Sequence, residues 1–276
     1  ENNPFVYLSG VNKSDIPVYQ WAGWHDFLIC EAFLWFANIK NTQKLTVGPW
    51  SHGSQDWHDL LSVEQLRWFD YWLKGIDNGV MDEPKIHYAI IEKPDTFTWH
   101  TADSWPPPDS RRIPYYLSEG PSGSINSVND GLLSREEPSG DSEYDKYTVD
   151  YSTSSEEEDM SINDAKGLTY TTPILDCDIT MVGHPIVTLY IMSSAEDVDF
   201  YVYLEEVAEN GFSKYVTDGI LRSSHRNESK SDFNNLGLPY HRHFKEDVKS
   251  LPEGKPVSLS FDLLPISRIF KRGKRI

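Results

Sequence analysis

Residues 16–53 read IPVYQWAGWHDFLICEAFLWFANIKNTQKLTVGPWSHG, and their pattern changes from strand to helix and back to strand. The apolar run 16–21 predicts a strand, and the apolar segment 27–39, which contains no Gly or Pro, predicts a helix packed on a sheet. Residues 44–47 predict a second strand, closed by Gly-Pro. Two strands joined through a helix within about 30 residues form a βαβ unit. The strands of such a unit are parallel, so their carboxyl ends meet at one edge of the sheet.

A second helix is expected after this unit. Ser62 followed by Gln65 matches a capping box, and Gly75 is typical of the residue that ends a helix. The apolar side chains expected to share one face of this helix are Leu66, Phe69 and Leu73. We therefore expect a helix that packs this face against the rest of the domain.

The apolar pattern changes to a period of two in the remainder of the chain. Residues 256–263 alternate apolar and polar side chains, as half-buried antiparallel strands do, and 200–204 predict another strand. All nine tryptophans lie within the first 105 residues, which indicates two units with different cores. The predicted fold is a parallel βαβ portion in residues 1–80, followed by an all-β sandwich or jelly roll in residues 81–276.

An acidic stretch at 136–166 interrupts the predicted strands. Ten acids lie between residues 136 and 159, against the single base Lys146. Runs of this kind are usually solvated, and the spacing matches no EF-hand calcium loop. We expect an irregular loop that is the most mobile internal segment of the chain.

Composition narrows the classes of partner. The formal charge of −18 disfavours nucleic acid and anionic membranes as partners, and 38% hydrophobic residues exclude wholesale disorder. No run approaches the roughly 18 apolar residues of a membrane helix. The two cysteines, Cys30 and Cys177, form neither a disulfide framework nor a metal motif. The first residues resemble no signal peptide and the last read as strand and turn, so we expect both ends to be cuts within a larger protein.

Two ionisable residues follow the ends of the predicted parallel strands. Asp26 comes after the first strand and His52 after the second. Because functional groups gather outside the carboxyl ends of such strands, both side chains are expected at the same sheet edge. An aspartate beside a histidine is the orienting half of a nucleophilic triad, in which the histidine takes the proton of the nucleophile. Asp before His also agrees with the order Ser, Asp, His of α/β-hydrolases, and the serine would then precede residue 1.

Other interpretations of these residues stay open. Asp26 precedes a predicted helix and is also a candidate N-cap, while loop histidines such as His52 are often only hydrogen-bonded. His52, Asp56, His58 and Asp59 are crowded enough for a metal site, but their spacing matches no zinc-protease pattern. The chain contains no Gly-x-Ser-x-Gly nucleophile elbow. We therefore expect two of three catalytic residues here, and no metal.

Several short motifs follow one another in a familiar order. They comprise residues 23–26, 48–53, 67–79, 197–200, 218–222 and 272–276. Together they resemble the acyl hydrolases that include cocaine esterase, X-Pro dipeptidyl-peptidase, α-amino acid ester hydrolase and glutaryl-cephalosporin acylase. The resemblance extends over essentially the whole chain.

The resemblance implies the C-terminal portion of an α/β-hydrolase domain, followed by a jelly roll, in a serine hydrolase that cleaves small-molecule esters or amides. Asp26 and His52 match the triad Asp and His of the family. Its Ser nucleophile, its oxyanion-hole Tyr and its helical cap have no counterpart here, so an upstream segment must carry them. His25 stands where the family commonly has Tyr. Trp24 and Trp50 are candidates to line an acyl pocket, with core packing as the alternative.

Because the chain contains no nucleophile elbow, a non-catalytic function is the alternative to the hydrolase. The chain would then be a carbohydrate- or protein-binding jelly roll attached to a degenerate hydrolase.

On the hydrolase interpretation no cofactor is required, and this chain alone is expected to be inactive because His52 has no nucleophile to activate. Ester, β-lactam and prolyl-peptide substrates are not distinguished by the sequence. The compartment and a homo-oligomeric state also stay open.

Overall fold

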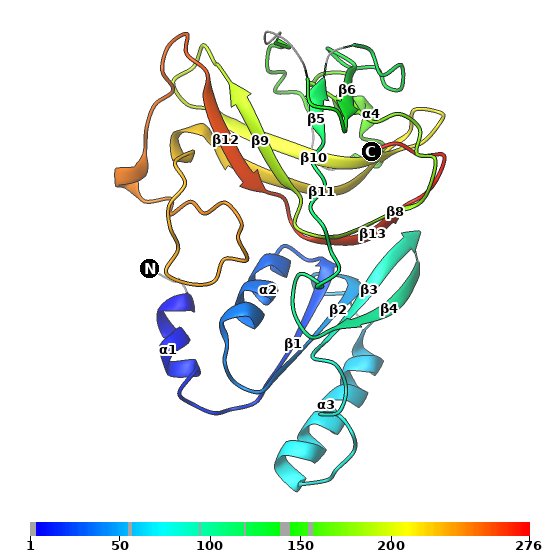
Figure 1. Ribbon diagram of the computed structural model, residues 1–276, viewed down its shortest axis with the longest axis vertical. Helices are drawn as coiled ribbons and strands as arrows, with labels where there is room; N and C mark the ends of the chain where they lie inside the picture. The colour runs from blue at the N-terminus through cyan, green and yellow to red at the C-terminus, as the bar shows by residue number, and fades with distance from the viewer. Residues whose placement is uncertain (1–3, 55–56, 94, 119, 139–143, 154–156) are drawn as a thin grey trace. The chain divides into compact units, whose positions relative to one another are not determined.

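The computed structural model describes residues 4–54, 57–93, 95–118, 120–138, 144–153 and 157–276 (Figure 1). The chain forms two compact units that are interleaved in sequence. The first unit comprises Glu1–Ser110, Val182–Tyr201 and Gly219–Ser267, and the second comprises Arg111–Met181, Val202–Asp218 and Arg268–Ile276. The division into residues 1–80 and 81–276 follows the sequence pattern instead, and it stays a prediction.

The first unit contains the βαβ element that the sequence predicts. After η1 (Pro4–Tyr7) and α1 (Leu8–Val11), the chain forms β1 (Val18–His25), α2 (Ile29–Asn38) and β2 (Gln43–Ser51). β1 and β2 pair in parallel, in a register that runs from Val18 opposite Gln43 to Gly23 opposite Gly48. The parallel βαβ prediction is thereby confirmed, although both strands extend further toward the site than the sequence indicates.

Further strands extend this sheet. β3 (Ile86–Lys93) pairs in parallel with β2, and β4 (Thr96–Ala102) pairs antiparallel with β3. The buried residues Ile29, Phe33 and Phe36 of α2 recur at helical spacing, so the helix covers the sheet with one apolar face. Leu45 and Val47 of β2 are fully buried, as expected for a central parallel strand.

Helix α3 (His58–Lys74) corrects the predicted second helix in two respects. It begins four residues before Ser62, whose hydroxyl donates to the His58 carbonyl at 2.8 Å, so Ser62 is not an N-cap. The predicted apolar face is exposed rather than buried, at 59% for Leu66, 51% for Phe69 and 78% for Leu73. The predicted end is confirmed, because Gly75 closes the helix with a φ of 68°, a conformation that favours glycine.

The later segments of the first unit are extended. β9 (Ile186–Ile191) pairs antiparallel with β12 (Val257–Asp262), and η2 (Ser223–His225) and η3 (Lys245–Asp247) are short 3₁₀ turns. Leu259 and Phe261 of β12 are buried between more accessible neighbours, which confirms the alternation predicted for this strand.

The second unit contains a small sheet and one helical turn. β5 (Tyr116–Ser118) pairs antiparallel with β6 (Gly131–Ser134), and β6 pairs in parallel with β7 (Tyr170–Thr171). In the predicted acidic loop, residues 139–143 and 154–156 lie outside the described residues. The loop interpretation is wrong at its end, where α4 (Ser161–Asp164) forms and the preceding Met160 is 1% exposed. This single apolar side chain anchors a segment whose charge suggested only solvation.

Four strands contribute residues to both units. They are β8 (Ile179–Gly183), β10 (Asp199–Val207), β11 (Ser213–Arg222) and β13 (Ile266–Phe270). β10 and β11 pair as a two-stranded sheet. Strands predominate after residue 80, as the sequence predicts, while their arrangement as a jelly roll stays a prediction. None of the helices in the described ranges has the length and apolar character needed to cross a membrane.

Candidate functional site

A β-bulge shapes the sheet edge where the candidate residues lie. Gly23 pairs with Gly48, but His25 pairs with Ser51, so β2 contains one more residue than β1 between these points. The extra residue belongs to the Pro49-Trp50 pair that precedes Ser51, the last residue of β2. A bulge bends its strand and redirects the residues that follow. It therefore sets the direction in which His52 leaves the sheet.

Two glycines allow Trp50 to occupy the bulge. A Cβ atom on Gly23 would lie 2.2 Å from the Trp50 carbonyl oxygen, and one on Gly48 would lie 2.5 Å from indole carbons of Trp50. Both distances are far below ordinary van der Waals contact, so only glycine fits at these positions. The sequence Gly23 and Gly48-Pro49-Trp50 thus encodes the geometry that precedes His52.

Trp24 and Trp50 are packing residues in the first unit. Trp50 is 9% exposed and stacks on Trp21 with ring centroids 5.4 Å apart. Trp24 is 6% exposed, and its indole N–H donates to the Ala89 carbonyl at 2.8 Å. This burial favours the core-packing alternative for both residues, and their role in an acyl pocket stays a prediction.

The side chains of Asp26 and His52 meet at the sheet edge. Oδ2 of Asp26 lies 3.0 Å from Nδ1 of His52, within the distance that the triad geometry requires. The other carboxylate oxygen, Oδ1, accepts the backbone N–H of Leu28 at 2.9 Å, one residue before α2 begins. The N-cap of α2 is Leu28, so the N-cap interpretation of Asp26 is wrong. One carboxylate oxygen of Asp26 contacts the imidazole, and the other accepts an N–H in the turn that precedes the helix.

His52 is held at one side and accessible at the other. The side chain of His52 is 58% exposed, whereas that of Asp26 is 20% exposed. The Phe27 ring packs beside the imidazole at a centroid distance of 4.7 Å. Within the part of the chain that the structure describes, Nε2 of His52 makes no hydrogen bond. An imidazole oriented through Nδ1 with an accessible Nε2 can accept a proton from a hydroxyl group that approaches from outside.

The crowded residues after His52 do not assemble into a metal site in the described structure. Asp56 lies outside the described residues, and His58 packs its ring against Trp57 at a centroid distance of 4.9 Å. Among the described residues, the one group of three with metal-ligand spacing comprises Cys30, His184 and Asp262, and His52 is not a member.

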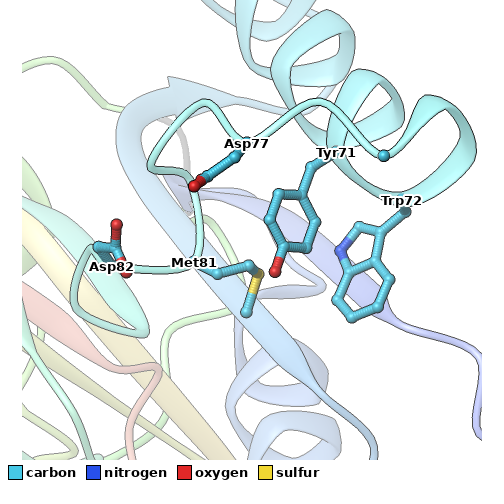
Figure 2. A pocket seen from close by; sticks show the side chains of 6 residues that line it. Tyr71, Trp72, Asp77, Met81 and Asp82 are labelled. Carbon is cyan, nitrogen blue, oxygen red and sulfur yellow. The ribbon is translucent and has the colours of Figure 1, made fainter.

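A hollow at the end of α3 is separate from the candidate pair (Figure 2). Its volume is about 530 Å³, and its lining residues are Tyr71, Trp72, Gly75, Asp77, Met81 and Asp82. The Tyr71 ring and the Met81 thioether point toward each other across it in Figure 2. Since neither Asp26 nor His52 lines it, the hollow is not part of the candidate catalytic site.

The second unit contains a pair of interacting buried carboxyl groups. Burial, followed by the negative charge of Glu205, raises the pKa of Asp164 to about 7. Burial also raises the pKa of Glu205, while the Ser213 hydroxyl donates to its carboxylate and lowers the pKa. Loss of hydration is the main cause of both shifts, and repulsion from a nearby negative charge adds to each. No sequence spacing indicates this pair, because Asp164 belongs to a helical turn and Glu205 to a distant strand.

A comparison with protein families matches most of the chain. The family model described as X-Pro dipeptidyl-peptidase C-terminal non-catalytic domain matches residues 78–276. Asp26 and His52 both precede the matched range.

Similarity to individual proteins extends over nearly the whole chain. The chain is 32% identical to a Mycobacterium bovis protein named serine esterase, over 99% of this chain and 46% of that protein. It is 24% identical to cocaine esterase of Rhodococcus sp., over 92% of this chain and 46% of that protein. The chain thus spans less than half the length of these curated relatives.

A solved structure has the same fold. The chain resembles a CocE/NonD family hydrolase from Staphylococcus aureus with a TM-score of 0.68 and 19% identity, over 96% of this chain and 46% of that one. At this identity the likeness concerns the fold alone. Together with the sequence matches, it confirms the resemblance that the short motifs indicate.

Proposed function

This chain belongs to the family of X-Pro dipeptidyl-peptidase C-terminal non-catalytic domains, and we propose that it forms the C-terminal part of a serine hydrolase that cleaves carboxylic esters or amides. Relatives of the chain are named esterases and dipeptidyl-peptidases, which supports hydrolase chemistry. The residues proposed for catalysis, Asp26 and His52, precede the part of the chain that matches the non-catalytic family model.

The contact between Asp26 and His52 carries the proposal. The two residues leave different strands, and their side chains meet at 3.0 Å with the imidazole accessible. In the proposed reaction, Nε2 of His52 takes the hydroxyl proton as a serine oxygen bonds to the substrate carbonyl carbon. The carboxylate of Asp26 holds Nδ1–H and stabilises the imidazolium that forms. The same proton then passes to the leaving group as its bond to the carbonyl carbon breaks, leaving an acyl-serine.

Deacylation repeats these steps with water. His52 takes a proton from water, whose oxygen adds to the acyl carbon, and returns it to the serine oxygen as the carboxylic acid leaves. The serine and the donors that stabilise the oxyanion belong, in this proposal, to a segment outside this chain. No cofactor enters any step.

The exposed face of α3 supports a further packed segment. Leu66, Phe69 and Leu73 are between half and four-fifths exposed, although their spacing is typical of a buried helix face. Contiguous apolar surface of this kind usually marks an interface. The relatives are about twice as long as this chain, so they contain a segment of sufficient length to cover it.

The finer architecture is part of the same proposal. Parallel pairing of β1, β2 and β3, with α2 between the first two, is the arrangement that the end of an α/β-hydrolase sheet requires. We assign the strands that follow β4 to a jelly roll that accompanies this domain.

A fluorophosphonate probe tests the proposal in the full-length protein. The probe phosphonylates a serine only where a neighbouring base activates it, so labelling should depend on His52. We expect His52→Gln to slow labelling at least about 1,000-fold. His58→Gln, which changes the same residue type in the following helix, should leave the rate within about twofold.

Two results would count against the hydrolase. Equal labelling of the wild-type and His52→Gln proteins would show that His52 does not activate the serine. A full-length protein that resists labelling but binds oligosaccharides would instead favour the non-catalytic binding module.

A further inference from the structure

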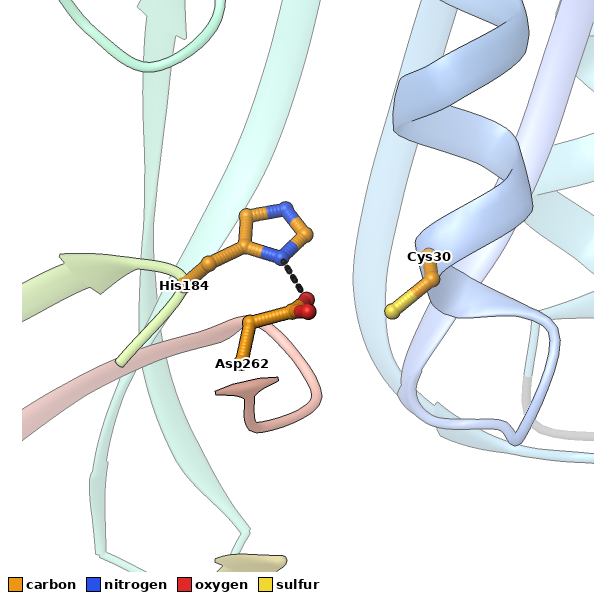
Figure 3. Close-up of side chains that lie close together, drawn as sticks. All are labelled: Cys30, His184 and Asp262. Atoms are coloured by element: carbon orange, nitrogen blue, oxygen red, sulfur yellow. Dashed lines mark hydrogen bonds and ion pairs between the residues drawn. The ribbon is translucent and has the colours of Figure 1, made fainter. Parts of the chain in front are cut away.

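Three side chains of metal-ligating types lie together in the first unit and include neither Asp26 nor His52. Cys30, His184 and Asp262 each offer one ligand atom, and these atoms all lie within 4.8 Å of one another (Figure 3). Nδ1 of His184 lies 3.3 Å from Oδ2 of Asp262. In Figure 3 the Cys30 sulfur points toward the same carboxylate from the neighbouring helix.

Regular structure positions all three side chains. Cys30 is the second residue of α2, and Asp262 ends β12 directly opposite Ile186 of β9. His184 stands in the tight turn between β8 and β9, after Gly183, whose φ of 128° is open to glycine but rarely to other residues. A site built on a helix end and two paired strands is better ordered than one built on free loops.

The cluster is partly buried. The side chain of His184 is 2% exposed and that of Asp262 is 25% exposed. Nε2 of His184 is buried without a hydrogen-bond partner in the described structure. Nδ1 is therefore the ring nitrogen that contacts the polar groups of the cluster. Phe33 packs edge-on against the imidazole at a centroid distance of 6.1 Å. The hydrophobic shell around a metal site controls how solvent reaches it.

We propose that Cys30, His184 and Asp262 bind a divalent transition-metal ion, for which Zn²⁺ is the best match. Thiolate, imidazole and carboxylate are the three ligand types that zinc combines in proteins. Zinc–ligand bonds of about 2.0–2.3 Å place the ligands of a tetrahedral site roughly 3.3–3.8 Å apart. The separation of His184 and Asp262 already falls in this range, and a small rotation of Cys30 would complete a three-ligand site with water in the fourth position.

A divalent ion suits the charges of the cluster, because it stabilises a thiolate and neutralises the Asp262 carboxylate. Binding forms the sulfur–metal bond, breaks the S–H bond and releases the proton to solvent.

Metal binding by the full-length protein tests the proposal, with Cys177→Ser as the matched control. After chelation and dialysis, the wild-type protein should take up one Zn²⁺ per chain. With Co²⁺ it should develop the near-ultraviolet thiolate-to-cobalt charge-transfer band. Cys30→Ser should abolish that band and weaken Zn²⁺ binding more than about 100-fold. Cys177 is exposed and outside the cluster, so Cys177→Ser should change neither result.

Two further measurements keep the test independent of folding defects. Asp262→Asn preserves the shape of the side chain but removes its charge, and it should weaken Zn²⁺ binding while retaining the cobalt–thiolate band at higher Co²⁺ concentration. Affinity of the wild type should rise about tenfold per pH unit, because one thiol proton is displaced. Failure of the wild type to bind Zn²⁺, a cobalt complex without the thiolate band, or unchanged binding in a folded Cys30→Ser protein would each overturn the proposal.

Discussion

Gly48→Ala is expected to destabilise the protein by forcing Trp50 out of its place in the bulge. The added Cβ would lie 2.5 Å from Cε2 and Cζ2 of the Trp50 indole and 2.6 Å from Cδ2. Carbon atoms pack at about 3.5–4.0 Å, so three ring atoms would be about 1 Å or more too close.

The ring has little room to move away. Trp50 is 9% exposed and stacks on Trp21 with nearly parallel planes at an angle of 14°. Its backbone is confined as well, because the Trp50 carbonyl lies against Gly23. Forcing one extra carbon into a packed site costs about 1–3 kcal/mol, and we expect a loss of unfolding free energy in that range. His52 is two residues further along, so its position relative to Asp26 should change too.

Urea unfolding monitored by tryptophan fluorescence measures the effect, with Gly10→Ala as the control. A Cβ on Gly10 would meet no atom within 4 Å, and alanine favours the helix α1 in which Gly10 lies. Gly10→Ala should therefore be neutral or stabilising by up to about 1 kcal/mol. In the full-length protein, Gly48→Ala should also lower esterase kcat, by about 100-fold if His52 shifts by about 1 Å.

An unchanged unfolding midpoint for Gly48→Ala would refute this reasoning. It would mean that Trp50 can leave the bulge freely, and the two glycines would then not be what fixes the sheet edge. Equal destabilisation by Gly10→Ala would likewise show that the effect is not specific to the bulge.

Two other predictions concern buried charges. Asp164 keeps its proton in the folded protein up to about pH 7, whereas in the unfolded chain it loses the proton near the ordinary pKa of aspartate. The free energy of unfolding should therefore fall as the pH rises between these two values, by at most about 1.4 kcal/mol per pH unit. Urea unfolding at several pH values should show this fall in unfolding free energy, and Asp164→Asn should reduce it. An equally steep fall in the variant would show that other groups cause the pH dependence. Lys44 is 2% exposed and pairs with Glu83, so Lys44→Ala should cost about 2–4 kcal/mol of unfolding free energy by urea titration. Lys74→Ala, which removes an exposed helix ion pair, should cost under about 0.5 kcal/mol, and equal losses in the two variants would contradict the role of burial.

The sequence was sufficient where local pattern and topology determine the outcome. The apolar runs around Val18 and Leu45 indicate strands, and the intervening helix requires them to be parallel. That topology alone predicts that Asp26 and His52 meet, because both follow strand ends at one edge. The exact course of the edge was not predictable, since the bulge depends on how Trp50 packs against distant glycines.

Sequence pattern could not reveal what covers a surface or joins distant segments. The spacing of Leu66, Phe69 and Leu73 indicates an amphipathic helix, but periodicity does not identify the element that covers it. Capping residues are also ambiguous, and Ser62 forms its hydrogen bond inside α3. Cys30 and His184 come from opposite parts of the first unit's sequence, so no local spacing indicated that they lie together. Such a cluster emerges only once the chain is folded.

The most direct test of the account is a double-mutant cycle on Asp26 and His52 in the full-length protein, measured as kcat for a p-nitrophenyl ester. Asp26→Asn and His52→Gln should each lower kcat at least about 10⁴-fold, and the double variant should be no slower than the slower single variant, because the two residues act as one unit. Asp59→Asn, an exposed carboxylate in the first turn of α3, should leave kcat within about twofold. Near wild-type turnover in either single variant, or losses that multiply in the double variant, would contradict the proposed mechanism.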